Sequence, residues 1–357
     1  MPEKQPKKLL IINILDILRK YTDENHRLNQ REIADILRTE YSMNINRKSV
    51  KRNLMSLIDF GYDIEYSETV RTITDPKTGK PEENVILSDF YLVRDFTDGE
   101  LRLLIDSLLF SRHISPGHRR ELIGKLEKLS NKHFRSRMKH ISGVTDGLPS
   151  NPQLFLTIEV LDEAISRKKQ VSLVYNRYGK DKKLHPTGDG KAPARQMINP
   201  YQMAAVNGRY YLICNNDNHD NLAYYQLDHI TDIKLLDTPR KPMKKVEGLE
   251  HGLDLPKHMA EHIYMYSGKS EAVVMRVEKG MINAVVQWFG KDVEFYDEDD
   301  GGITARVTAN HEAMRRWALQ YSLYIKIISP PGLVEQVKED IRKAAENYGL
   351  QTVKGGA

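Results

Sequence analysis

The sequence contains one cysteine, Cys214, and no long run of apolar residues. A single cysteine excludes an internal disulfide framework and a cysteine-rich zinc site, so we expect a protein of a reducing compartment. No segment approaches the roughly 20 apolar residues that a membrane-spanning helix requires. The apolar run 9–15 follows lysines in the manner of a signal peptide, but Asp16, Arg19 and Lys20 interrupt it. We therefore expect a cytoplasmic protein with no membrane span.

Length and charge point to several domains and a polyanionic partner. A chain of 357 residues is too long for one ordinary core, and about 150 residues per domain gives two or three domains. The net charge of +5 is unevenly distributed: residues 1–62 carry +4, residues 151–245 carry +5 and residues 246–357 carry −4. This asymmetry is typical of a protein that meets a polyanion with one end.

The N-terminal pattern predicts three helices followed by a hairpin. The first helix spans residues 9–21, and the second begins at Asn29, which forms a capping box with Glu32. The third helix, residues 47–60, ends at Gly61, as a helix with a left-handed C-terminal glycine does. Two extended stretches, 62–74 and 84–93, flank the turn sequence 75–80. This order predicts a winged helix in residues 1–93.

The rest of the chain predicts an α+β multidomain protein. Residues 94–150 have a helical pattern and are expected to form a connector. Short strands around the Asn207-Gly208 turn predict a small SH3/Sm-like β-barrel in residues 151–240. A linker with a short helix, residues 241–268, precedes a βαββαβ order in residues 269–357, which predicts a ferredoxin-like domain.

The third predicted helix has a polar side suited to DNA. With 100° per residue, Val50, Leu54 and Leu57 fall on one apolar stripe. Long cations and short hydrogen-bonding groups on the solvent side of an anchored helix are what a major-groove helix requires. The alternative is a merely solvated face, and the hairpin that follows favours DNA. The residues expected to contact DNA are Arg47, Lys48, Ser49, Lys51, Arg52 and Asn53.

Several motifs in order identify a family. The chain resembles the WYL-domain transcription regulators, which join a winged helix, a WYL barrel and a C-terminal extension domain. In the name-giving tripeptide Tyr210-Tyr211-Leu212, a tyrosine stands where the family has tryptophan. The other matching segments are Lys48–Leu54, Asn199-Pro200-Tyr201, Asn207-Gly208-Arg209, Tyr225–Ile230, Trp317–Tyr321 and Ser329-Pro330.

The resemblance implies a sensor pocket in the barrel that binds an effector, such as a nucleotide or single-stranded nucleic acid. The family commonly has arginine at the positions of Gln226 and His229. It also usually has an arginine shortly before the proline, where Gln196 and Met197 stand here and Arg195 lies one or two places early, so the pocket loses positive charge. We expect His229 to restore part of that charge at mildly acidic pH. The alternative is that the tyrosines are barrel core and edge residues. The expected effector-binding residues are Tyr175, Arg195, Tyr201, Tyr210, Asp228 and His229.

The sequence thus predicts a ligand-responsive regulator that binds double-stranded DNA as a homodimer, with no cofactor and no metal. A single-stranded nucleic-acid-binding accessory protein is the alternative. An enzyme would depend on the H-x-x-E-H pattern of His258, Glu261 and His262, which some zinc peptidases use. Because no third ligand is indicated, we interpret it as an exposed helix between domains and expect no enzymatic activity.

Overall fold

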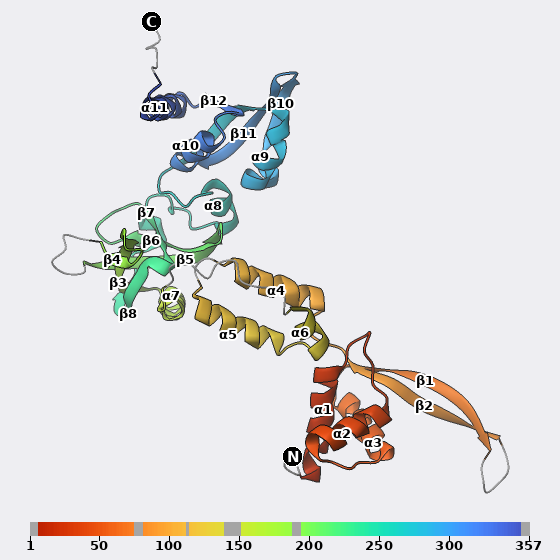
Figure 1. The fold of residues 1–357 in the computed structure, drawn as a ribbon. Coiled ribbons are helices and arrows are strands. Elements are labelled where there is room, and N and C mark those ends of the chain that lie inside the picture. The colour runs from red at the N-terminus through yellow and green to blue at the C-terminus, as the bar shows by residue number, and fades with distance from the viewer. Residues whose placement is uncertain (1–5, 75–80, 112–113, 139–150, 188–193, 351–357) are drawn as a thin grey trace, which may run out of the picture. The chain divides into compact units, whose positions relative to one another are not determined.

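The computed structural model describes residues 6–74, 81–111, 114–138, 151–187 and 194–350. The chain is a mixed helix-and-sheet protein that divides into two compact units near residue 147 (Figure 1). The predicted turn at residues 75–80 lies outside the described residues.

Three helices begin the first unit, as the sequence predicts. They are α1 (Leu10–Tyr21), α2 (Gln30–Tyr41) and α3 (Arg47–Phe60). The capping box is present, because Asn29 Oδ1 accepts from the Glu32 amide at 3.0 Å and Glu32 Oε2 accepts from the Asn29 amide at 2.8 Å. Gly61 ends α3 with φ 111°, a left-handed conformation that glycine adopts without steric cost.

A long hairpin follows and extends away from the three helices (Figure 1). Its antiparallel strands are β1 (Ile64–Thr74) and β2 (Pro81–Leu92), with Val70 opposite Val85. The buried base of β2, Leu87 and Phe90, packs into the core that α1, α2 and α3 form. The helix–helix–helix–hairpin order is therefore as predicted.

The helical segment that follows belongs to the same unit. It contains α4 (Asp98–Phe110), α5 (Pro116–Glu127) and α6 (Lys132–Met138). The side-chain amide of Asn131 donates to the Thr22 carbonyl at 3.1 Å and to Asp23 Oδ2 at 2.6 Å. Because Asn131 is fully buried, these bonds fix the start of α6 to the end of α1.

The second unit begins with a helix and a six-stranded antiparallel sheet. Hydrogen bonding gives the strand order β4-β3-β5-β6-β7, and β8 pairs with β3. The elements are α7 (Leu154–Arg167), β3 (Lys169–Tyr178), β4 (Leu184–Pro186), β5 (Arg195–Val206), β6 (Arg209–Asn216), β7 (Leu222–Gln226) and β8 (Ile230–Pro239). The local sequence pattern did not predict β4 and β8.

The sheet is not the closed barrel that the sequence predicts. Strand β7 has five residues, and Leu227–His229 then form a 3-10 turn that redirects the chain. Strand β8 consequently pairs with β3, and within the described residues it does not pair with β7. The turn at Asn207-Gly208 is as expected, with φ 50° and 72°, values that a tight hairpin turn requires.

A short helix and a second sheet complete the unit. The order βαββαβ is as predicted, and the antiparallel strands lie in the order β10-β11-β9-β12. Trp317, fully buried, lies in the core of this sheet and its helices. The elements are α8 (Leu255–Glu261), β9 (Ser270–Val277), α9 (Ile282–Phe289), β10 (Glu294–Asp299), β11 (Gly302–Asn310), α10 (His311–Gln320), β12 (Ile325–Ser329) and α11 (Pro331–Asn347).

Candidate functional site

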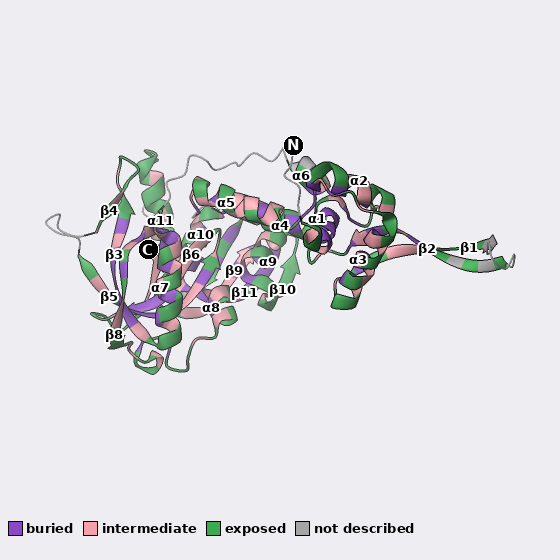
Figure 2. Ribbon diagram, turned by 90° about the horizontal axis from the view of Figure 1, so that it is seen from below, coloured by how far each residue is buried: buried purple, intermediate pink, exposed green. Residues whose placement is uncertain are grey.

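The exposed side of α3 carries cations that have no ion-pair partner. Val50, Leu54 and Leu57 are buried, and the opposite side of the helix is exposed (Figure 2). Among the described residues, no carboxylate forms an ion pair with the three exposed cations of this helix. A cation without a carboxylate partner can bind a phosphate or a base edge without first breaking an ion pair. These cations are Arg47, Lys48 and Arg52.

The other predicted contact residues of α3 are less accessible. Ser49, Lys51 and Asn53 are half-buried. The Asn53 amide donates to the Ser49 carbonyl at 2.8 Å, so part of its hydrogen-bonding capacity is used within the helix. The structure therefore places the cations, more than the short polar side chains, on the solvent side.

A cavity of about 620 Å³ lies on the sheet of the second unit and is rich in tyrosine. The Tyr175 ring meets the Tyr225 ring edge-on, with centroids 4.6 Å apart, and lies 5.7 Å from the His229 ring. Such rings offer stacking surfaces to a flat ligand. The lining residues are Tyr175, Arg177, Thr187, Gln196, Tyr211, Ala223, Tyr224, Tyr225, Gln226, His229, Tyr264, Met265, Tyr266 and Ser267.

Two neutral glutamines, Gln196 and Gln226, line this cavity where the family commonly has arginine. Gln226 Nε2 donates to the Tyr211 hydroxyl at 3.1 Å, and Gln226 Oε1 accepts from Arg209 at 3.1 Å. Arg177 is exposed at the lining and has no ion pair with a described residue. The cavity therefore has a cation, Arg177, that was not among the predicted effector-binding residues.

His229 lines the cavity, where its surroundings disfavour the positive charge predicted for it at mildly acidic pH. Burial lowers the pKa of its imidazole, although the neighbouring Asp228 carboxylate opposes that shift. His229 Nε2 and Asp228 Oδ1 are buried atoms with no hydrogen-bond partner among the described residues. Burial also raises the pKa of the Tyr175 phenol to about 12, so this hydroxyl stays protonated.

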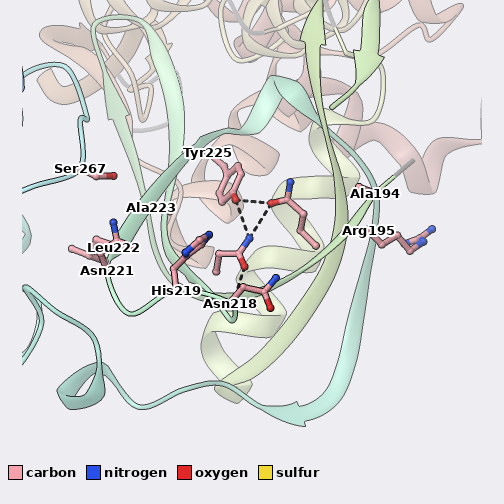
Figure 3. Close-up of a pocket in the computed structure, with 11 residues that line it drawn as sticks. Ala194, Arg195, Asn218, His219, Asn221, Leu222, Ala223, Tyr225 and Ser267 are labelled. Atoms are coloured by element: carbon pink, nitrogen blue, oxygen red, sulfur yellow. Dashed lines mark hydrogen bonds between the residues drawn. The ribbon is translucent and has the colours of Figure 1, made fainter. Parts of the chain in front are cut away.

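A second, more polar cavity of about 560 Å³ adjoins the first. Gln196, Ala223, Tyr225 and Ser267 line both cavities. The Tyr225 hydroxyl, labelled in Figure 3, donates to Gln196 Oε1 at 2.6 Å. The remaining lining residues are Ala194, Arg195, Asn216, Asn218, His219, Asn221 and Leu222.

The six predicted effector-binding residues do not form one site. Tyr175 and His229 line the first cavity, whereas Arg195 lines the second. Arg195 points away from Tyr225 (Figure 3) and donates to the Asp232 carbonyl at 3.0 Å. The other three, Tyr201, Tyr210 and Asp228, line neither cavity.

Tyr201 is a core residue. Its side chain is 2% exposed and packs in the cluster that contains Ile213 and Met265. Its hydroxyl donates to the Lys241 carbonyl at 2.8 Å, and the Arg240 guanidinium lies 5.0 Å from its ring. Tyr201, which was predicted to bind the effector, therefore lies in the core and lines neither cavity.

Several tyrosines that line the cavity were not among the predicted effector-binding residues. Tyr211 and Tyr225 stand within motifs already noted, and alternation along β6 and β7 could have placed them on the cavity side. Tyr264 and Tyr266 lie in the segment before β9, and the local sequence offers only their spacing of two residues as an indication that both side chains face the same way.

The two histidines of the H-x-x-E-H pattern are buried, whereas Pro256, Lys257 and Ala260 on the other side of α8 are exposed, as expected of a partly exposed helix. His258 is 9% and His262 is 6% exposed, and their rings stack with centroids 4.0 Å apart. His258 Nε2 lies 2.9 Å from the Tyr224 hydroxyl, so this nitrogen is occupied. Within the described residues, no group of three or more His, Cys, Asp or Glu side chains is arranged to hold a metal ion.

No helix in the described part of the chain is long and apolar enough to cross a membrane. Cys214 is buried in β6, as expected of a structural thiol.

Comparison with known proteins identifies two domains in the second unit. The WYL domain model matches residues 157–235, and the WCX domain model matches residues 269–345. No curated protein matches the chain significantly.

Solved structures match at low similarity, among them the following two. Proteasome accessory factor B/C (PafBC) of Arthrobacter aurescens is 14% identical, with a TM-score of 0.27; the match covers 97% of this chain and 50% of that one. The present chain thus spans half the length of that protein. A structure described as a CRISPR Cas-related protein is 12% identical, with a TM-score of 0.34, and the match covers 98% of this chain and 88% of that one.

Proposed function

We propose that this chain, which is a WYL-domain protein with a WCX domain behind it, is a ligand-responsive DNA-binding transcription regulator. The observation that carries the proposal is the group of exposed cations on α3 that form no ion pair with a described residue; this helix lies in a helix–helix–helix–hairpin unit ahead of the WYL domain. We assign residues 1–93 to a winged helix, 94–150 to a connector, 151–240 to the sensor, 241–268 to a linker and 269–357 to the extension domain.

The DNA-reading element of the proposal is α3. Its apolar side is anchored by Val50, Leu54 and Leu57, and Arg47, Lys48 and Arg52 occupy the free side. A helix held in this way can enter the major groove of double-stranded DNA, where arginine and lysine bind guanine edges or phosphates.

The sensing element of the proposal is the tyrosine-rich cavity. Tyr175, Tyr211 and Tyr225 offer stacking surfaces, and Arg177 offers charge to a phosphate. A nucleotide or a short single-stranded nucleic acid fits this chemistry. We propose that such an effector changes the geometry of a homodimer and thereby its operator affinity, as linkage requires when an effector binds two states differently.

One experiment tests DNA recognition directly. Duplexes that bind the full chain are selected from a random pool at fixed salt, with and without added nucleotides. A regulator enriches a defined sequence, and a two-half-site pattern is expected from a homodimer, because half-sites lie about 34 Å or a multiple of it apart. Enrichment of no duplex sequence would contradict the proposal.

A single-stranded nucleic-acid-binding accessory protein remains the second candidate, because the tyrosine cavity alone would serve it. Sequence-specific protection of duplex DNA from nuclease separates the two, since only the regulator gives it. Light scattering at micromolar protein tests assembly, and a monomer mass both free and on DNA would contradict the homodimer.

A further inference from the structure

A short segment between α8 and β9 forms part of the wall of the tyrosine-rich cavity. Tyr264, Met265, Tyr266 and Ser267, which we call the strap, all line it. The strap lies outside the stretch that matches the WYL domain, residues 157–235. A wall of the cavity is therefore supplied by residues that the WYL domain does not contain.

The strap is anchored to the sheet of the WYL domain on one side. Met265 is 5% exposed and belongs to the same core cluster as Ile213 and Leu222. The Asn207 side-chain amide donates to the Ile263 carbonyl, just before the strap, at 2.9 Å. Met265 also has a left-handed backbone, φ 53°, which a non-glycine residue keeps only where its surroundings hold it.

The strap is anchored to the WCX domain as well. The Tyr264 ring meets the Trp288 ring edge-on at 5.3 Å, and the Tyr264 hydroxyl donates to Gln320 Oε1 at 2.9 Å. The Arg316 guanidinium lies 5.7 Å from the Tyr266 ring. Two helices of the WCX domain, α9 and α10, therefore hold the tyrosines of the strap.

The contacts continue into the WCX core. Trp288 Nε1 donates to the Tyr321 hydroxyl at 3.2 Å, and the Tyr321 ring lies 4.9 Å from the ring of the fully buried Trp317. Tyr264 and Trp288 are both half-buried, and each ring covers part of the other. A ligand that displaces Tyr264 therefore changes the surroundings of Trp288.

We infer that the ligand cavity is composite: the WYL sheet supplies one wall, and the strap, positioned by Trp288 and Gln320 of the WCX domain, supplies the other. A flat ring lies between the sheet tyrosines and the strap tyrosines. Cavity occupancy and WCX packing are then coupled, and the coupling is reciprocal. The inference rests on the proposed effector function and adds the WCX domain to its binding site.

The two tryptophans of the chain make the test direct. Trp317→Phe leaves Trp288 as the only tryptophan, and Trp317 Nε1 is buried without a hydrogen-bond partner, so the substitution removes no hydrogen bond among the described residues. In this background of the full chain, saturation with a labelled five-nucleotide oligodeoxythymidine is expected to change the emission of Trp288 and its quenching by acrylamide.

Affinity measurements provide the reciprocal arm. Trp288→Leu and Gln320→Ala are expected to weaken binding of the oligonucleotide about tenfold, measured by anisotropy, although neither residue lines the cavity. The matched control is Ile327→Ala, which removes a buried side chain of the same domain on β12. Equal affinity of all three variants, with unchanged Trp288 emission, overturns the inference and leaves the effector proposal standing.

A ligand-free arm separates the two proposals. Ala223 lines the cavity from β7, and Ala223→Leu adds volume there; its folding is checked by thermal unfolding. If the oligonucleotide does not bind but the added volume changes Trp288 emission, the coupling is supported and the nucleic-acid effector is wrong. If neither the oligonucleotide nor Ala223→Leu changes Trp288 emission, the inference is overturned.

Discussion

The hydroxyl of Tyr224 lies 2.9 Å from Nε2 of His258, and this bond joins the tyrosine-rich cavity to a buried histidine pair. His262 stacks on His258, and its Nδ1–H donates to the His258 carbonyl oxygen 3.0 Å away. Burial raises the pKa of the Tyr224 phenol, so its hydroxyl remains a donor to a neutral His258. A neutral His258 can accept this hydrogen bond at Nε2, whereas a protonated one cannot.

The histidine pair predicts a loss of stability in mild acid. Burial lowers the pKa of His258 to about 4, whereas a histidine in the unfolded chain has a pKa of about 6.5. Between these values the unfolded chain binds more protons, so the free energy of unfolding falls as pH falls from about 6.5 to 4. Thermal unfolding across this range measures it.

His258→Phe keeps an aromatic ring at the stack and removes this titration. We expect a flatter pH profile and a constant loss of about 1–3 kcal/mol at neutral pH, since Tyr224 loses its acceptor. His251→Gln, at an exposed position, is the control and is expected to leave the profile as in wild type. An unchanged profile in His258→Phe would contradict the prediction.

The exposed cations of α3 predict the response of DNA binding to mutation. Arg52→Ala or Lys48→Ala is expected to cost about 1–3 kcal/mol if the side chain contacts a base, or to lower the salt slope by about 1 if it contacts phosphate. Titration of the selected duplex at several salt concentrations measures both quantities. Arg38→Ala on α2 is the control, because Arg38 pairs with Asp35. Wild-type binding by both α3 variants would exclude this helix as the reader.

Arg177 is the cation expected to bind effector phosphate at the tyrosine-rich cavity. Arg177→Gln is expected to lower the salt slope of oligonucleotide binding by about 0.7, the value for one phosphate contact with a single strand. Arg167→Gln on α7 is the matched control, because Arg167 already pairs with Glu163. We expect a smaller effect of Arg195→Gln, whose guanidinium binds the Asp232 carbonyl. A slope equal to that of wild type in Arg177→Gln would remove this residue from the site.

Gly302 is required by the WCX sheet. Its φ is 136°, and a Cβ at this position would lie 2.3 Å from the Val277 carbonyl oxygen of the neighbouring strand. Gly302→Ala is expected to lower the free energy of unfolding by about 2–4 kcal/mol. Denaturant titration followed by tryptophan emission measures it, because both tryptophans lie in this domain. Gly301→Ala is the control, since the nearest atom to its Cβ is a side-chain oxygen 3.3 Å away.

The local sequence determined the elements whose signals are themselves local. The Asn29–Glu32 capping box, the glycine at position 61 and the Asn207-Gly208 turn each depend on hydrogen bonds or backbone angles within a few residues. The apolar stripe of α3 likewise identified its buried side, because helix periodicity fixes which residues share a face.

The tertiary structure decided what depends on residues far apart in the chain. Strand β8 pairs with β3, which lies more than fifty residues earlier, and the sheet stays open because, among the described residues, β8 does not also pair with β7. Tyr201 lies in the core and Tyr264 lines the cavity. The register of β5 and the position of the strap, rather than the residue type, determine which tyrosine is accessible to solvent. The histidines of the H-x-x-E-H pattern were buried for the same reason: Tyr224 of a distant strand packs over them. Sequence spacing specifies a face of an element, but only long-range packing specifies what that face meets.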